Sequence, residues 1–165
     1  YTSKTCWKIF PKQIVNEKYQ QLDIIKELLV SFGIPVIDAA GFEGDDLIAT
    51  IATHAEEQGS ELIVVTGDRD SYQLVKDPLV RVLYNKRGVS DYALYDEAGI
   101  LERTGVTPTL YVQYAALRGD TSDNLPGVPG VGEKTAAKLI NKYGGLDGLF
   151  ADVDSQTPKL KENLV

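Results

Sequence analysis

The pattern of apolar and polar positions alternates between two periods along the first half of the chain. Residues 15–32 have apolar side chains at helical spacing, and Gly33 is a natural end for that helix. Residues 34–37 have the composition of a short strand. Residues 45–57 return to helical spacing, and residues 61–65 contain an unbroken apolar run, typical of a strand buried on both faces. The expected inner face of the helix 45–57 consists of Leu47, Ile48, Ile51 and Ala52.

Residues 79–84 have the composition of a further strand, and residues 86–88 that of a turn. The alternation of strands and helices predicts an α/β fold with a mostly parallel sheet and helices on both of its faces. In such sheets, binding sites gather beyond the carboxyl ends of the strands. Asp68 and Asp70 follow the strand 61–65 and fall at such an end.

After about residue 95 the strand signals cease. Residues 96–103 predict a short helix closed by Gly105, and Thr107 followed by Pro108 predicts the start of another that reaches Leu117. Residues 133–143 and 146–150 are helical in pattern, with two glycines between them, and the tail beyond residue 151 is polar and uninformative. We therefore expect an α/β part over residues 1–95 and an all-helical part over residues 96–165.

Three short acidic clusters are placed around these elements. They lie at the start of the helix 45–57, at the end of the strand 61–65, and just before a glycine-rich run at residues 127–132. Carboxylates gathered in one place repel one another unless hard cations neutralise them, and clusters of oxygen ligands suit Mg²⁺ or Mn²⁺ rather than zinc. The candidate metal ligands are Glu43, Asp45, Asp46, Asp68, Asp70, Asp120 and Asp123.

A simpler interpretation of these acids stays open. Aspartates at a helix start commonly cap free backbone amides, and Gly-Asp after a strand is common in turns. The coincidence of three clusters at what would be one edge of a parallel sheet favours metal binding. Two ions held about 3.5–4 Å apart are the arrangement that hydrolyses phosphodiesters.

The net charge of −7 argues against a nucleic-acid partner at first sight. The seven clustered acids account for it, because the remaining acidic residues equal the 17 basic ones in number. The acidity is therefore local, and DNA is not excluded as a partner. No apolar stretch approaches the roughly 18 residues that span a bilayer, so no membrane is expected. The single cysteine, Cys6, provides neither a disulfide nor zinc-ligand spacing and fits an intracellular setting.

The glycine-rich run opens the predicted helix 133–143. Glycines allow a phosphate to approach the backbone closely, and the amides of a helix N-terminus favour an anion. Lys134 and Lys138 lie one turn apart on one face, with Lys142 a turn further on. A purely structural glycine hairpin with solvated lysines is the open alternative.

Three ordered motifs, at residues 41–50, 65–70 and 117–139, resemble the 5′–3′ nuclease domain of bacterial DNA polymerase I, within the flap endonuclease family. The third reads Leu-Arg-Gly-Asp-Thr-Ser-Asp-Asn-Leu-Pro-Gly-Val-Pro-Gly-Val-Gly-Glu-Lys-Thr-Ala-Ala-Lys-Leu. The resemblance implies a resolvase-type nuclease core of the PIN-like class, followed by a helix–three-turn–helix over residues 107–143. It also implies a structure-specific 5′–3′ exonuclease or flap endonuclease that cuts DNA or RNA primers in replication and repair.

By that resemblance, Asp45, Asp68, Asp70 and Asp123 are catalytic acids, within a set that holds two or more Mg²⁺ or Mn²⁺ ions. A potassium ion in the helix–three-turn–helix is also expected, with Ser122 as a hydroxyl ligand. The residues expected to contact DNA are Ser122, Gly127, Gly130, Gly132, Lys134, Thr135 and Lys138.

The implied partners are flap, nicked or 5′-ended duplex DNA and a covalently linked polymerase domain, in the nucleoid of a bacterial cytoplasm. Members of the family carry further metal-binding aspartates on two earlier strands. They also have a basic helical arch over the active site, and residues 1–20 match the pattern of that arch poorly. The chain has no methionine and starts at Tyr1, so we expect it to be a fragment. The hypothesis of a non-catalytic DNA-binding module therefore stays open. A phosphatase is a third hypothesis, which is weakened because the sequence has no match to the Asp-x-Asp nucleophile that phosphatases carry on a first strand.

Overall fold

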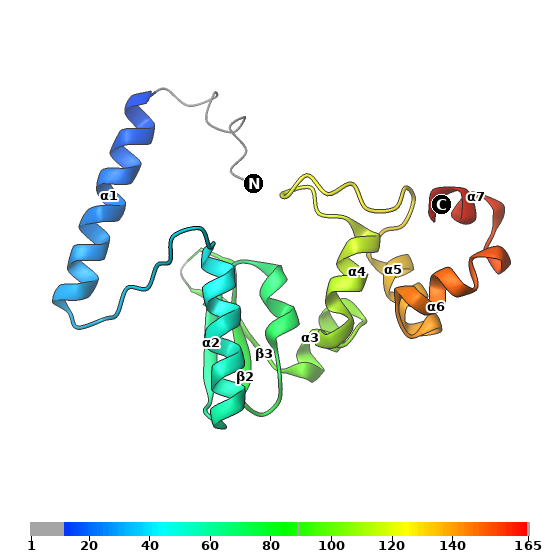
Figure 1. Cartoon of the computed structure of the whole chain (residues 1–165), viewed down its shortest axis with the longest axis horizontal. Helices are drawn as coiled ribbons and strands as arrows, with labels where there is room; N and C mark the ends of the chain where they lie inside the picture. The colour runs from blue at the N-terminus through cyan, green and yellow to red at the C-terminus, as the bar shows by residue number, and fades with distance from the viewer. Residues whose placement is uncertain (1–11, 89, 165) are drawn as a thin grey trace. The chain divides into compact units, whose positions relative to one another are not determined.

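A computed structural model describes residues 12–88 and 90–164 of the chain, with side chains from residue 21 onward. Cys6 and the greater part of the segment compared with the arch lie outside the described residues. The elements run in the order shown in Figure 1. They are α1 (Lys12–Ser31), α2 (Gly44–Gln58), β1 (Leu62–Thr66), η2 (Arg69–Leu74), β2 (Val80–Arg87), β3 (Asp91–Tyr95), α3 (Glu97–Thr104), η3 (Pro108–Leu110), α4 (Tyr111–Arg118), α5 (Glu133–Tyr143), α6 (Leu146–Ala151), η4 (Val153–Ser155) and α7 (Pro158–Leu164).

The chain divides into two compact units between Leu47 and Ile48, and each is described by itself. In the first unit, α1 ends as predicted before Gly33, whose φ of 72° is the left-handed conformation that favours glycine. The predicted strand 34–37 is wrong, because these residues form no strand. An extended segment becomes a strand only through a hydrogen-bonded neighbour, and the described residues provide none for this segment.

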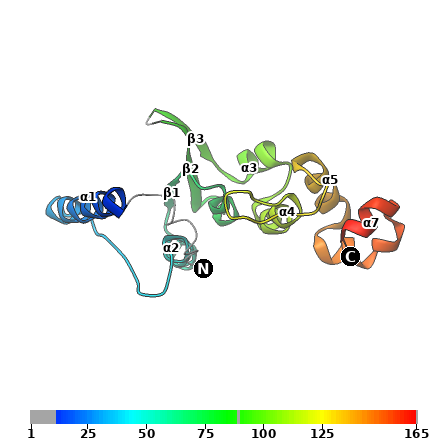
Figure 2. The same cartoon turned by 90° about the horizontal axis from the view of Figure 1, so that it is seen from above.

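The second unit contains a three-stranded sheet in the order β1-β2-β3 (Figure 2). β1 and β2 pair in parallel, with Leu62 opposite Val80, and β2 and β3 pair antiparallel, with Val82 opposite Tyr95. The α/β class is confirmed, and its sheet is mixed. The expected turn begins later than residue 86, because β2 continues to Arg87.

The expectation that the strand at 61–65 is buried on both faces is wrong. Val64 is buried, whereas Ile63 and Val65 on either side of it are exposed. Successive side chains of a strand point to opposite faces, so only one face of β1 is covered by the described residues. Ile51 in α2, expected on the inner face of its helix, is also exposed, while Ala52 is buried.

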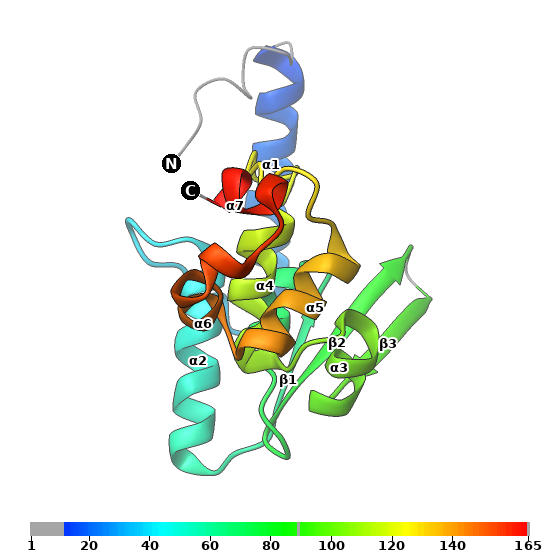
Figure 3. The ribbon, with the colours of Figure 1, turned by 90° about the vertical axis from the view of Figure 1, so that its right-hand side faces the viewer.

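The helices after the sheet follow the sequence pattern closely. Asp96 caps α3 by accepting a hydrogen bond from the Gly99 N–H at 2.7 Å, and Gly105 ends that helix with a φ of 81°. α4, α5 and α6 pack in succession, as Figure 3 shows. The tail, which has no clear pattern, forms η4 and α7. No helix within the described parts of the chain has the length and apolar character required to cross a membrane.

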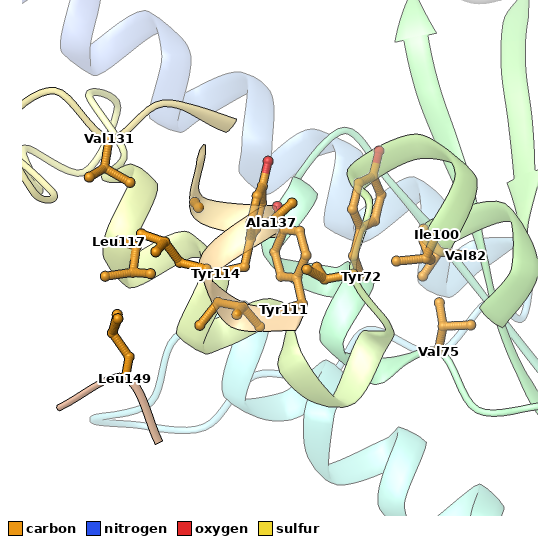
Figure 4. Packing of buried hydrophobic residues seen from close by; sticks show 14 of the residues in the cluster. Tyr72, Val75, Val82, Ile100, Tyr111, Tyr114, Leu117, Val131, Ala137 and Leu149 are labelled. Atoms are coloured by element: carbon orange, nitrogen blue, oxygen red, sulfur yellow. The ribbon is translucent and has the colours of Figure 1, made fainter. Parts of the chain in front are cut away.

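The hydrophobic core of the second unit is built around Tyr72 of η2, which is only 1% exposed. Its ring lies 5.4 Å from those of Tyr84 and Tyr95 and 5.5 Å from that of Tyr111, in edge-to-face contacts. Figure 4 shows Val82 of β2 and Ile100 of α3 on one side of Tyr72, and Tyr111 and Tyr114 of α4 on the other. The core is therefore continuous across residue 95, and the division of the chain at 95/96 stays a prediction.

Candidate active site

A cavity of about 620 Å³ lies in the second unit, where the loop after β1 faces the loop between α4 and α5. The β1 side contributes Asp68 and Arg69, and the opposite loop contributes Asp120 and Asp123. The complete lining is Gly67, Asp68, Arg69, Tyr84, Arg118, Gly119, Asp120, Thr121, Ser122, Asp123, Leu125, Pro126 and Glu133. Two of the three acidic clusters predicted from the sequence are thus brought together from segments about 50 residues apart.

Asp68 combines a capping role with a place in this cleft. Its Oδ1 accepts a hydrogen bond from the Asp70 N–H at 2.9 Å and so caps η2, while its own N–H donates to Thr66 Oγ1 at 3.0 Å. The capping interpretation is therefore correct for Asp68. It does not exclude metal binding, because an ionised carboxylate has two oxygens and about four acceptor positions.

Asp70 is half-buried beside the cleft but does not line it. Burial raises the pKa of its carboxyl above 3.8, and the negative charges of Asp68, Asp123 and Asp120 raise it further. The Arg118 guanidinium acts in the opposite direction. The direction of this shift agrees with the repulsion that the sequence analysis predicts, although burial is its larger cause.

Asp120 is held by its neighbours on both of its oxygens. The Arg118 Nη2 donates to Oδ2 at 3.0 Å, and the Ser122 N–H donates to Oδ1 at 2.9 Å. The Ser122 hydroxyl also donates a hydrogen bond to Oδ1. These hydrogen bonds from Ser122, helped by the Arg118 charge, lower the pKa of Asp120. Asp120 therefore stays ionised and oriented by its own loop.

The loop between α4 and α5 is closed at its base by backbone contacts. Asp120 and Leu125 exchange two N–H to carbonyl hydrogen bonds of 2.8 Å each, and the Val128 N–H donates to the Leu117 carbonyl at 2.9 Å. Gly119 and Gly127 pass each other so closely that a Cβ on Gly119 would lie 2.7 Å from the Gly127 nitrogen. Only glycine fits at this crossing, and Asp123 lies within the loop that it closes.

The donor set fits a hydrated Mg²⁺ or Mn²⁺ better than a fully enclosed ion. Among residues 21–88 and 90–164, whose side chains the structure describes, no three Asp, Glu, His or Cys side chains are in position to hold a metal together. Mg²⁺ usually keeps several waters and uses only one or two carboxylates. Asp68, Asp120 and Asp123 around one wide cleft, with Asp70 beside it, are compatible with that mode.

The first acidic cluster belongs locally to the start of α2. Asp45 and Asp46 lie in the first turn of that helix, and the Glu43 N–H donates to Asp46 Oδ2 at 3.0 Å. Asp46 thus has a local role at the helix start. These residues are in the first unit, so the expectation that they join the other acids stays a prediction.

The glycine-rich run leads into α5 where the sequence predicts it. Gly132 occupies the N-cap position of α5, where no side chain caps the first backbone amides of the helix. A Cβ on Gly130 or Gly132 would meet no atom within 4 Å. Lys134, Thr135 and Lys138 are exposed. The side of α5 with Ala136, Ala137, Leu139 and Ile140 is buried.

Lys142 has a different role from the other lysines of α5. Its Nζ donates to the Tyr143 hydroxyl at 2.7 Å and lies 4.5 Å from the centre of that ring. The ammonium group is therefore engaged within the protein.

Several residues of the cleft lining were not among the candidate site residues of the sequence, and Arg69, Tyr84, Arg118 and Glu133 carry polar side chains. Arg69 lies between two acids of the second cluster, and its Nη1 is 3.3 Å from Glu133 Oε1, at the start of α5. Arg118 immediately precedes the third cluster, and Tyr84 comes from β2. The available signal was that both arginines lie within the motifs 65–70 and 117–139, directly next to the acids.

Two protein-family models match consecutive parts of the chain. The 5′-3′ exonuclease N-terminal resolvase-like domain matches residues 11–105, and the 5′-3′ exonuclease C-terminal SAM fold matches residues 106–165.

Among curated relatives, DNA polymerase I of Mycobacterium leprae is 52% identical over 158 residues, which cover 96% of this chain and 17% of that protein. A 5′-3′ exonuclease of Mycobacterium tuberculosis is 45% identical over 159 residues, which cover 93% of this chain and 49% of that protein. The chain thus spans about one sixth of the polymerase and about half of the exonuclease.

The fold also matches a solved structure of the bacteriophage T5 flap endonuclease in complex with DNA and metal ions. The TM-score is 0.76 at 20% sequence identity, and the match covers 97% of this chain and 58% of that one. At this identity the likeness establishes the shared fold.

The glycine crossing can be tested by a matched pair of substitutions. Gly127→Ala combines a φ of 61° with a Cβ that would lie 2.6 Å from the Arg118 carbonyl carbon, so we expect a loss of about 2–5 kcal/mol of unfolding free energy. Gly130→Ala has a similar φ of 79° but open space, and we expect a loss of only about 1–2 kcal/mol. Urea unfolding would measure both, and equal losses would contradict the close crossing at Gly127.

Burial of the Asp70 carboxylate, together with repulsion by the neighbouring acids, predicts a pH-dependent effect of Asp70→Asn in EDTA. Since the folded pKa of Asp70 is raised above 3.8, ionising it disfavours the folded state, and stability is lost as the pH rises through that pKa. The variant should therefore melt at a higher temperature than the parent protein at pH 7, and the difference should vanish below the ordinary carboxyl pKa. Asp23→Asn, an exposed change in α1, is the control. A lower melting temperature for Asp70→Asn at pH 7 would contradict the destabilisation of the ionised carboxyl by burial and repulsion.

Proposed function

Because the chain belongs to the 5′-3′ exonuclease family, we propose that it forms part of a structure-specific nuclease that hydrolyses phosphodiesters in DNA or RNA primers. The observation that carries the proposal is the cleft in which Asp68 faces Asp120 and Asp123, beside the start of the lysine-bearing helix α5. The proposed substrates are flap, nicked or 5′-ended duplex DNA formed in replication and repair. The T5 enzyme of the same fold was crystallised with DNA and metal ions, which supports both partners.

In this proposal Asp68, Asp70 and Asp123 are the catalytic acids of the second unit, and together with Asp120 they hold two or more Mg²⁺ or Mn²⁺ ions. Such ions supply an activated water and stabilise the leaving oxygen of the scissile phosphodiester. The first cluster is proposed to complete the ligand set. In it Asp45 is a further catalytic acid, and Glu43 and Asp46 are further metal ligands. The local capping contacts of Asp46 and Asp68 fix the orientation of both carboxylates before any ion binds.

The glycine-rich run and α5 are proposed to grip the phosphate backbone of duplex DNA. Gly127, Gly130 and Gly132 permit close approach to backbone amides, while Lys134, Thr135 and Lys138 present exposed donors along one face. A potassium ion is proposed in the same loop. The Ser122 hydroxyl donates a hydrogen bond to Asp120, so the lone pairs of the Ser122 oxygen stay available to bind an ion.

The relatives named DNA polymerase I support a covalently linked polymerase domain as a further proposed partner, and a place in the nucleoid of a bacterial cytoplasm.

A second candidate function is a non-catalytic DNA-binding module. It is favoured by the finding that no three metal-ligating side chains of the described residues are in position to hold an ion together. The two functions differ in one measurable property, since only the nuclease cleaves DNA in a metal-dependent way.

The nuclease is tested with a labelled 5′-flap substrate, using the chain extended by any residues that its gene encodes on either side. We expect Mg²⁺ or Mn²⁺ to support release of short 5′ products. Asp123→Asn should lower the single-turnover rate by about 100-fold or more, because the residue holds metal, while DNA affinity in Ca²⁺ stays unchanged. Asp91→Asn, an exposed change outside the cleft lining, is the control. Cleavage at the parent rate by Asp123→Asn would contradict the assignment, and metal-independent binding without cleavage would favour the DNA-binding module.

The phosphate grip is tested separately by the salt dependence of duplex binding in Ca²⁺. Each neutralised phosphate releases counterions, so Lys134→Ala with Lys138→Ala should lower the magnitude of the log–log slope by about one per lost contact, for unrelated DNA sequences alike. Lys142→Ala is a matched control on the same helix, because its ammonium group is bound by Tyr143. Fluorescence anisotropy measures the slope. An unchanged slope in the folded double variant would leave the glycine run as a structural hairpin.

A further inference from the structure

Arg118, the last residue of α4, has a mostly buried side chain that contacts the loop 119–125 at two points. Its side chain is 11% exposed. The Nε–H donates to the Gly119 carbonyl at 2.9 Å, and Nη2 donates to Asp120 Oδ2 at 3.0 Å. One planar guanidinium therefore joins a backbone group and a carboxylate of the same loop, a geometry that a single ammonium group does not reproduce.

The other face of this guanidinium rests on the helical core. Its central carbon lies 5.4 Å from the centre of the Tyr114 ring, and Tyr114 is 2% exposed. A mostly buried cation is costly unless it is paired, and here Asp120 supplies the opposite charge. The side chain is thus held on the core side by Tyr114 and on the cleft side by Asp120.

The position of Asp120 determines where the rest of the loop can go. Asp120 is bonded to Leu125 through both backbone groups, and its Oδ1 accepts from Ser122. Asp123 lies between these anchor points. A loop fixed at residues 119–120 and 125 has little freedom to move Asp123 along or away from the cleft.

We propose that Arg118 is a positioning residue, which ties the loop 119–125 to the helical core so that Asp120 and Asp123 face Asp68 across the cleft. This inference rests on the proposed function, because Arg118 would affect cleavage only through the metal ions that Asp120 and Asp123 are proposed to hold. Arg118 contacts no substrate in this account and acts through Asp120. Its removal should therefore weaken metal binding and the cleavage rate without a direct loss of DNA grip.

The test compares Arg118→Met and Arg118→Lys with Arg103→Met, which removes an equal charge from an exposed site in α3. In the described structure Arg103 makes no hydrogen bond or ion pair with the loop. Three quantities are measured on folded protein: amide hydrogen exchange at Asp120 and Leu125, the Kd for Mn²⁺, and the cleavage rate against DNA affinity in Ca²⁺.

For Arg118→Met we expect exchange at both amides to rise by about tenfold or more, while the amides of β2 keep their protection. The Mn²⁺ Kd should rise by about 10- to 100-fold, with the cleavage rate falling similarly and DNA affinity unchanged. Arg118→Lys should be intermediate, because it keeps the charge but cannot hold both acceptors in one plane. Arg103→Met should match the parent protein in all three.

Parent-like exchange and Mn²⁺ affinity in Arg118→Met would overturn the proposal. Faster exchange with parent-like Mn²⁺ affinity would also overturn it, since loop order would then not matter to the ions. If Arg118→Met does not fold, Arg118→Lys decides, and parent-like values in that variant contradict the account. A parent protein that neither binds Mn²⁺ nor cleaves DNA would instead contradict the proposed function, so the two failures are distinguishable.

Discussion

The repulsion among carboxylates in and beside one cleft is the constraint on which the arrangement of the candidate site depends. Asp68 and Asp70 come from the end of β1, and Asp120 and Asp123 come from the loop after α4. Burial raises the pKa of Asp70, and the negative charges of Asp68, Asp123 and Asp120 raise it further. Such an arrangement persists in a folded protein only if local contacts hold each acid and cations reduce the repulsion. Arg118 and Arg69, both in the cleft lining, supply fixed positive charge, and divalent ions would supply the remainder.

The two sides of the cleft meet through one continuous core. Tyr72 follows Asp70 by two residues and packs edge-to-face on Tyr111 of α4, whose last residue is Arg118. The ion pair between Arg69 and Glu133 connects the β1 side with the first residue of α5. Asp68, Asp70, Asp120, Asp123 and the helix proposed to bind phosphate thus belong to the same compact unit of the chain.

Features that depend on local chemistry could be predicted from the sequence. α5 was predicted over residues 133–143 because glycines lie at both ends and apolar residues recur at helical spacing. The second and third acidic motifs pointed to the residues of the cleft because carboxylates gathered near strand and helix ends are informative in themselves. Features that depend on partners distant in the sequence could not be predicted. Residues 34–37 have strand composition but no strand beside them, and the hold of Arg118 on Asp120 depends on the fold of the loop.

The most direct test of the central claim is to find where Mn²⁺ binds in the folded chain. Paramagnetic broadening of backbone amide signals by substoichiometric Mn²⁺ would show this by NMR, in a chain of 18.1 kDa. We expect the broadening to centre on residues 67–70 and 119–124, and signals of α7 to stay sharp. Broadening centred elsewhere, or none at millimolar Mn²⁺ in a folded protein, would contradict the assignment of this cleft as the metal site.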